Sequence, residues 1–206
     1  MDEQQRGHLL IGSFIHKLNT VWHKPANQIF IVIILAHWSE HVMQAFQVYA
    51  LNHPRVHSHG LIGQWVPWLN TSEWLHYGYA VVILVALILL QPGFIGRSRV
   101  WWNIALGIQL WHFLEHALLL MQAGLDMTFF GSAEKSSILQ LLIPRVELHL
   151  FYNAMVSIPM AVAMWYHCFT NPAEQTCLCS RIGRIGSIRD SEGSQGNGTD
   201  QVLESS

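Results

Sequence analysis

Four long apolar runs alternate along the chain with shorter polar stretches. The runs cover roughly residues 27–51, 73–91, 101–123 and 144–169. A helix needs about 20 apolar residues to cross the hydrocarbon core of a bilayer, and each run is about that long. The pattern predicts an all-α integral membrane protein with four transmembrane helices.

The segments on either side of these runs have a different character. In residues 8–23 the apolar residues recur at helical spacing, which predicts an amphipathic helix lying on the membrane surface and ended by Pro25. The residues after 170 are rich in Gly, Ser, Asp and Arg, which is typical of disorder. The expected organisation is an interfacial helix in 1–26, a transmembrane domain in 27–170 and a disordered cytoplasmic tail in 171–206.

Composition agrees with a membrane protein. Hydrophobic residues make up 51% of the 206 positions and charged residues only 12%, whereas soluble domains average about 25% charged. The net charge of −2 does not indicate nucleic-acid binding. The three cysteines make no C-x-x-C pair, so neither a disulfide framework nor covalent haem attachment is expected. Cys177 and Cys179 follow the last run and are candidates for palmitoylation.

Lysine and arginine set the expected orientation. Eight of the eleven lie in the N-terminal segment, the 92–100 connection and the tail, whereas the two long loops hold only Arg55, Lys135 and Arg145. By the positive-inside rule both termini are cytoplasmic and the long loops are extracytoplasmic.

The first and third runs contain the same polar cluster. Residues 37–41 and 112–116 both spell His-x-x-Glu-His. At about 100° per residue, the two histidines and the glutamate of each cluster span about 100° of helix surface. Three metal-competent side chains should therefore share one face of each helix, inside hydrocarbon.

The two clusters belong to an internal repeat. An offset of 75 relates the first cluster and Gln47 to the second cluster and Gln122, and an offset of 73 relates His76 and Tyr79 to His149 and Tyr152. Each repeat is a two-helix hairpin, in 27–91 and 101–170, and an even number of spans keeps both copies in one orientation. We expect an antiparallel four-helix bundle in which the four histidine-bearing faces meet.

Glu40 and Glu115 lie in runs without lysine or arginine. A carboxylate in hydrocarbon is costly and usually marks function; it must be protonated, paired or bound to a cation. Imidazole with carboxylate suits iron, zinc, copper or manganese, and soluble di-iron bundles use a related ligand set. Iron is the first expectation, then copper or zinc. The predicted metal ligands are His37, Glu40, His41, His76, His112, Glu115, His116 and His149.

The leading hypothesis is a non-haem, di-metal membrane oxidoreductase acting on a small or lipophilic substrate. A b-type cytochrome is an alternative, because paired histidines could hold haem b and Gly78 or Gly107 could admit a porphyrin. A metal or proton transporter is another, with His53, His57 and His59 in the outer loop. Inverted zinc proteases also contain a His-x-x-Glu-His motif. In this chain the motif occurs twice, so the two copies are more simply explained as halves of one site. Expected partners are the lipid bilayer, the substrate, and a membrane electron donor or a second copy of the chain.

Overall fold

The computed structural model describes residues 3–71 and 73–169, and this part of the chain is helical with no strands. Five helices are long: α1 (Glu3–Leu18), α2 (His23–Tyr49), α5 (Trp74–Leu90), α6 (Gly96–Leu125) and α7 (Arg145–Phe169). The connections contain short helical turns, which are η1 (Arg55–His57), α3 (Ile62–Trp65), α4 (Pro67–Thr71), η2 (Gln91–Gly93) and η3 (Leu139–Leu141). The predicted tail, with Cys177 and Cys179, lies outside the described residues.

Four of the helices are long and apolar enough to span a membrane: α2, α5 extended by η2, α6 and α7. The predicted multi-pass membrane character is confirmed at this level. The fourth run matches α7 closely, but the prediction that Pro25 ends the first helix was wrong. Helix α1 already ends at Leu18, and Pro25 lies in the first turn of α2. Proline is tolerated there because the first N–H groups of a helix have no intrahelical acceptor.

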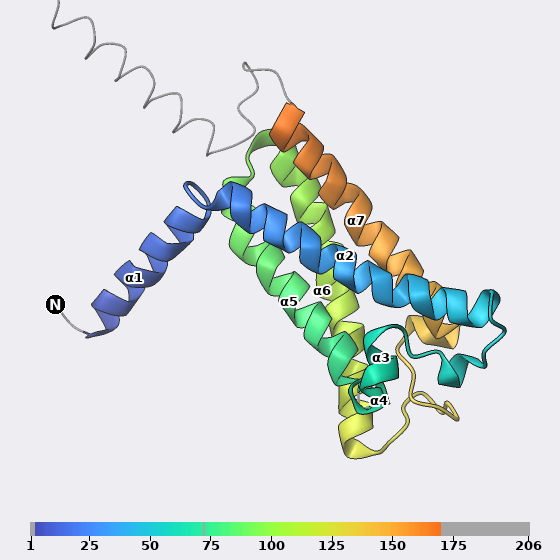
Figure 1. The fold of residues 1–206 in the computed structure, drawn as a ribbon. Helices are drawn as coiled ribbons and strands as arrows, with labels where there is room; N and C mark the ends of the chain where they lie inside the picture. The colour runs from blue at the N-terminus through green and yellow to red at the C-terminus, as the bar shows by residue number, and fades with distance from the viewer. Residues whose placement is uncertain (1–2, 72, 170–206) are drawn as a thin grey trace, which may run out of the picture.

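The four long apolar helices pack around a common interior. Helices α5 and α7 each contact both α2 and α6. In Figure 1, α5 and α7 run opposite to α6, and α2 lies obliquely across α6. Residues 50–71, residue 73 and residues 126–144 lie at one end of the molecule, which we call the loop end. The 91–95 connection and the end of α7 lie at the opposite end.

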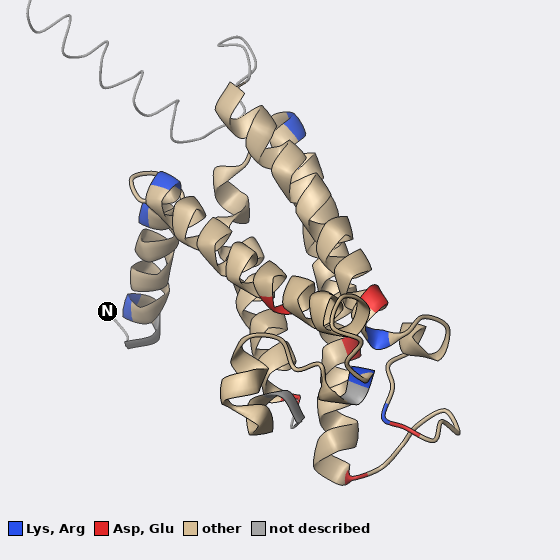
Figure 2. Ribbon diagram, turned by 45° about the vertical axis from the view of Figure 1, so that its right-hand side comes forward, with Lys and Arg blue, Asp and Glu red and all other residues tan. Residues whose placement is uncertain are grey.

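Polarity is inverted relative to a soluble helical protein. The outward positions of α2 include Ile29, Val32 and Leu35, which are 64%, 65% and 62% exposed. The buried side of α2 instead carries histidine, glutamate and glutamine. In Figure 2 the charged residues gather mainly at the two ends of the molecule. An apolar outside with a polar inside is the arrangement that a bilayer favours.

The interior has two tiers. Near the end opposite the loops, apolar side chains fill it, and Phe94 stacks on Trp102 with ring centroids 3.9 Å apart. The Trp102 indole donates to the carbonyl of Leu87 at 2.8 Å, which satisfies its buried N–H. Toward the loop end the same faces of α2 and α6 become polar. The apolar tier therefore holds the helices together, and the polar tier is the place to look for chemistry.

Candidate metal centre

Six histidines from all four long apolar helices meet in the polar tier. None is more than 4% exposed. Neighbouring ring centroids lie 4.5 to 5.9 Å apart, within each helix and between helices. We call this set the histidine cluster: His37, His41, His76, His112, His116 and His149. The structure therefore brings together every histidine that the sequence proposed as a ligand.

Two members have a defined tautomer. His149 Nδ1 lies 2.6 Å from the backbone carbonyl of Arg145, which can only accept, so this nitrogen carries the proton. His41 Nδ1 lies 3.0 Å from the side-chain oxygen of Gln44 in the same way. In both rings Nε2 is then unprotonated and has a free lone pair. Both Nε2 atoms are buried without a hydrogen-bond partner. Metal-binding histidines typically show this arrangement, with one nitrogen held by an oxygen and the other free to coordinate.

The other four histidines also have a buried ring nitrogen without a hydrogen-bond partner, in each case Nδ1. Leaving a buried polar atom unsatisfied costs about 1–3 kcal/mol. Six such atoms in one small volume are more than a stable fold ordinarily carries, unless something else satisfies them. A metal ion accepts electron pairs from unprotonated imidazole nitrogens and would satisfy several at once.

Spacing within the cluster is compatible with coordination. The Nε2 atoms of His112 and His116 are 3.2 Å apart and share a hydrogen bond, which a bound ion would replace. Two imidazoles on one tetrahedral ion, with metal–nitrogen distances near 2.05 Å, would place their nitrogens about 3.3 Å apart. Among the described residues, no three His, Cys, Asp or Glu side chains are already arranged to hold an ion. Binding of a metal ion would therefore require the imidazole rings of the cluster to rotate, but not the helices to move.

The two glutamates of the repeated motif turn toward the loops. Both carboxylate oxygens of Glu40 accept backbone N–H groups, from Leu61 at 2.8 Å and Ile62 at 2.7 Å. Glu115 accepts the N–H of Leu139 at 2.9 Å and also lines the small space beside His112 and His116. Each carboxylate thus ties a loop to the polar tier, whether or not it also contributes a lone pair to a metal.

Gln47 and Gln122 hold the same loops in matching ways. Gln47 donates to the carbonyl of Gly60 at 3.3 Å and accepts its N–H at 3.1 Å. Gln122 donates to the carbonyl of Ser136 at 2.9 Å and accepts its N–H at 3.4 Å. The repeat offset of 75 that relates the two glutamines is thus matched by equivalent clamps on the loop backbone.

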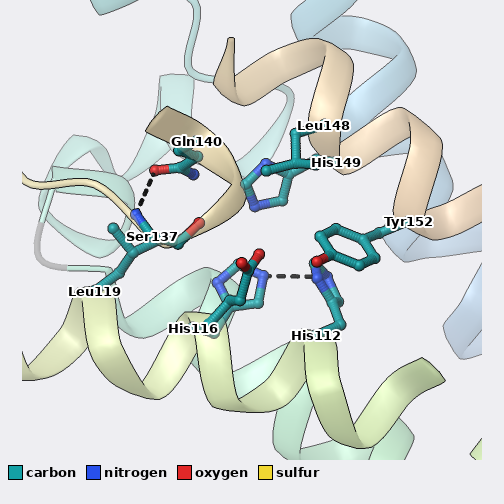
Figure 3. Close-up of a pocket in the computed structure, with 9 residues that line it drawn as sticks. His112, His116, Leu119, Ser137, Gln140, Leu148, His149 and Tyr152 are labelled. Atoms are coloured by element: carbon teal, nitrogen blue, oxygen red, sulfur yellow. Dashed lines mark hydrogen bonds between the residues drawn. The ribbon is translucent and has the colours of Figure 1, made fainter. Parts of the chain in front are cut away.

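Aromatic side chains and one loop close the centre. The Tyr79 ring lies 4.8 Å from that of His37, and the Tyr152 ring lies 4.4 Å from that of His112. Figure 3 shows His112 and His116 on α6 facing His149 and Tyr152 on α7, with Ser137 and Gln140 from the preceding loop beside them. The space that these side chains enclose has no room for a water-sized sphere. The centre can therefore accept an ion between its nitrogen atoms more readily than a molecule.

Sequence reasoning missed the partner of Glu73. The Glu73 carboxylate forms a two-point ion pair with the Arg145 guanidinium, in which Nη1 donates to Oε1 at 2.6 Å. Both residues stand at helix starts that meet at the loop end, and no spacing rule relates residues 72 positions apart. Glu147 likewise pairs with Arg55 at 2.6 Å and accepts the Tyr49 hydroxyl.

The remaining loop candidates lie apart from the cluster. His53 and His57 are exposed, and His59 lines a different cavity at the loop end. Cys168 is an exposed free thiol near the opposite end. Gly107, one of the two glycines that could admit a porphyrin in the haem alternative, is exposed on α6, and a Cβ there would meet no atom within 4 Å.

Comparison of the chain with protein-family models, with curated proteins and with solved structures finds no match. The class of protein therefore rests on the chain itself: a multi-pass helical membrane protein with a buried histidine cluster.

Proposed function

We propose that this protein is an integral-membrane, non-haem metalloprotein whose histidine cluster binds one or two transition-metal ions, and that it acts as an oxidoreductase on a small substrate. The observation that carries the proposal is the pair of Nε2 lone pairs on His41 and His149. Both are buried, unprotonated and without a hydrogen-bond partner, and their rings stack 4.9 Å apart.

The ligand chemistry favours iron or copper. Six imidazoles without a cysteine in the cluster suit Fe, Cu or Zn, while the hard ions Ca²⁺ and Mg²⁺ prefer oxygen ligands. A divalent ion would also offset the negative charge of Glu40 and Glu115, since a buried carboxylate needs a compensating charge. Iron is our first choice because the Glu115 carboxylate lies beside His112 and His116, and copper is the second.

Matched contacts support a two-fold repeat in the bundle. Tyr79 contacts His37 as Tyr152 contacts His112, and the two glutamine clamps are equivalent. We propose that hairpins 27–91 and 101–170 are related by a pseudo-two-fold axis along the membrane normal. Both termini would then face the cytoplasm, as the lysine and arginine distribution favours, and the loop end would face the opposite side.

The packing disfavours the haem alternative. The histidine rings touch one another directly, and the space beside them has no room for a water-sized sphere, so a porphyrin would require the helices to move apart. One observation supports the transporter alternative: a cavity at the loop end is lined by Gln44, which contacts His41, and by Gln140, which also lines the space beside His112 and His116.

The test is metal analysis and optical spectroscopy of the purified protein in detergent. We expect one or two equivalents of iron or copper, no Soret band, and a visible spectrum that changes on reduction with dithionite. His149→Ala should lose most of the metal and His57→Ala should keep it. A Soret band, or failure to retain any transition metal after reconstitution, would overturn the proposal. Loosely held zinc that moves across vesicle membranes would favour the transporter.

A further inference from the structure

A second cavity, of about 530 Å³, lies at the loop end of the molecule. Both long loops and the first turn of α7 contribute to its wall, together with Gln44 from α2. The side chains that matter for its chemistry are Gln44, Glu73, Lys135, Gln140 and Arg145. This cavity is separate from the small space beside His112 and His116.

Two of these side chains join the cavity to the histidine cluster. Gln44 lines the cavity and accepts the hydrogen bond of His41 Nδ1. Gln140 lines both the cavity and the small space bounded by His112, His116 and His149. Its side-chain nitrogen is buried without a hydrogen-bond partner, so no bond to another protein group fixes the amide nitrogen in place. A solute in the cavity is therefore separated from the histidines by two glutamine side chains.

Charges on the cavity wall are largely balanced. Arg145 pairs with Glu73, and Arg55 pairs with Glu147. Lys135 donates to Asp126 at 2.9 Å, and this hydrogen bond lowers the pKa of the Asp126 carboxyl. A charge-balanced wall that carries several polar side chains does not repel a hydrated cation.

The opposite approach to the cluster is closed by packing. The apolar tier fills the interior toward the other end, and Phe30, Leu87 and Trp102 in it are at most 2% exposed. An ion arriving from that end would have to shed its water among apolar side chains, at a large desolvation cost.

We infer that hydrated divalent cations reach the histidine cluster from the loop end, through this cavity and between Gln44 and Gln140. The inference rests on the proposed metal site and adds its route and the class of solute that it admits, which is small and water-soluble.

The route can be tested by blocking it. In a variant with Cys168, Cys177 and Cys179 replaced by serine, Ser132→Cys places a thiol on the cavity wall, where Ser132 is partly exposed. The thiol is converted to a mixed disulfide with a bulky methanethiosulfonate. Uptake of Co²⁺ by the metal-free protein is then followed through its visible absorption bands. The matched control keeps Cys168 alone, in the cavity of about 600 Å³ at the opposite end, and carries the same label.

We expect the label at position 132 to slow Co²⁺ uptake at least tenfold without changing the final amount bound, and reduction of the mixed disulfide to restore the rate. The label at Cys168 should leave the rate unchanged. An unaltered rate with position 132 fully labelled, or slowing by the Cys168 label instead, would overturn the inference. Absence of Co²⁺ uptake by the unlabelled protein would instead overturn the metal site itself.

Discussion

The imidazole rings of His41 and His149 stack with centroids 4.9 Å apart and 23° between their planes. One ring comes from α2 and the other from α7, so the contact joins the first long apolar helix to the last. Each ring donates its Nδ1 proton to an oxygen on its own helix, from Gln44 and from Arg145 respectively. These two hydrogen bonds therefore fix both tautomers and leave Nε2 of each ring unprotonated before any ligand arrives.

Gln44 is accordingly a positioning residue. Gln44→Leu removes the acceptor that fixes the His41 tautomer, and we expect metal affinity to fall about 10- to 100-fold, the usual cost of losing the outer partner of a ligand. Affinity is measured by competition with a chelator, and the visible spectrum should shift as well. The control is Gln109→Leu. Gln109 is buried on α6 and donates to the carbonyl of Ala80, so its loss should lower the melting temperature but not the affinity.

Gly60 must be glycine for two separable reasons. Its φ is +75°, and a Cβ there would lie 2.2 Å from Glu40 Oε2. Gly60→Ala should destabilise the protein by about 2–4 kcal/mol, because left-handed strain adds to overpacking. Gly131 has φ +67° with no atom within 4 Å, so Gly131→Ala should cost only the strain, about 1 kcal/mol. Unfolding in detergent measures both, and equal losses would mean that the Glu40 contact is unimportant.

The Glu73–Arg145 ion pair should show strong coupling. Its side chains are 10% and 38% exposed, so one partner is nearly buried. Removing either alone should cost about 1–3 kcal/mol, since the remaining charge is left uncompensated in a partly desolvated place. The double variant Glu73→Gln with Arg145→Gln should recover part of this loss. A double-mutant cycle of unfolding free energies gives the coupling directly, and additive losses would count against it.

The four transmembrane helices and the six histidines of the cluster could be predicted from the sequence, because both follow from short-range periodicity. Length and hydropathy mark a membrane helix, and residues four apart share a helix face, so His37 and His41 had to point the same way. The repeated motif then implied that α2 and α6 present equivalent faces. These inferences needed no knowledge of the loops.

The partners of Glu40, Glu73 and Glu115 could not be read in this way. Glu40 and Glu115 bind backbone N–H groups in the loops, and any residue type supplies the same N–H, so the sequence holds no signal for the contact. Gln140 reaches the centre from a loop without periodicity. The one available hint was that Gln47 and Gln122 are separated by the repeat offset of 75. This offset identifies the two glutamines as an equivalent pair, but it does not indicate which loop groups they bind.

Orientation in the membrane is tested with single cysteines in the cysteine-free background. Glu134 in the second long loop and Arg99 near the start of α6 are both exposed, at opposite ends of the molecule. In intact cells an impermeant thiol reagent should label Glu134→Cys but not Arg99→Cys, because the positive-inside rule places Arg99 in the cytoplasm. The reverse labelling would place the loop end in the cytoplasm. Ser58 and Ser98 are unsuitable probes, because they are only 5% and 0% exposed.

The two-fold arrangement of the centre makes the most specific prediction. His37 and His112 occupy equivalent places, each against a tyrosine and each one turn before a second histidine of the cluster. If one shared centre exists, His37→Ala and His112→Ala should perturb the same spectroscopic signal. The double variant should be little worse than either single one, because groups that act as a unit are not additive. Metal content and the visible spectrum measure this, with His57→Ala as the control. If each single variant instead removes half of the metal and leaves the other half unperturbed, each hairpin holds its own ion and the shared centre is wrong.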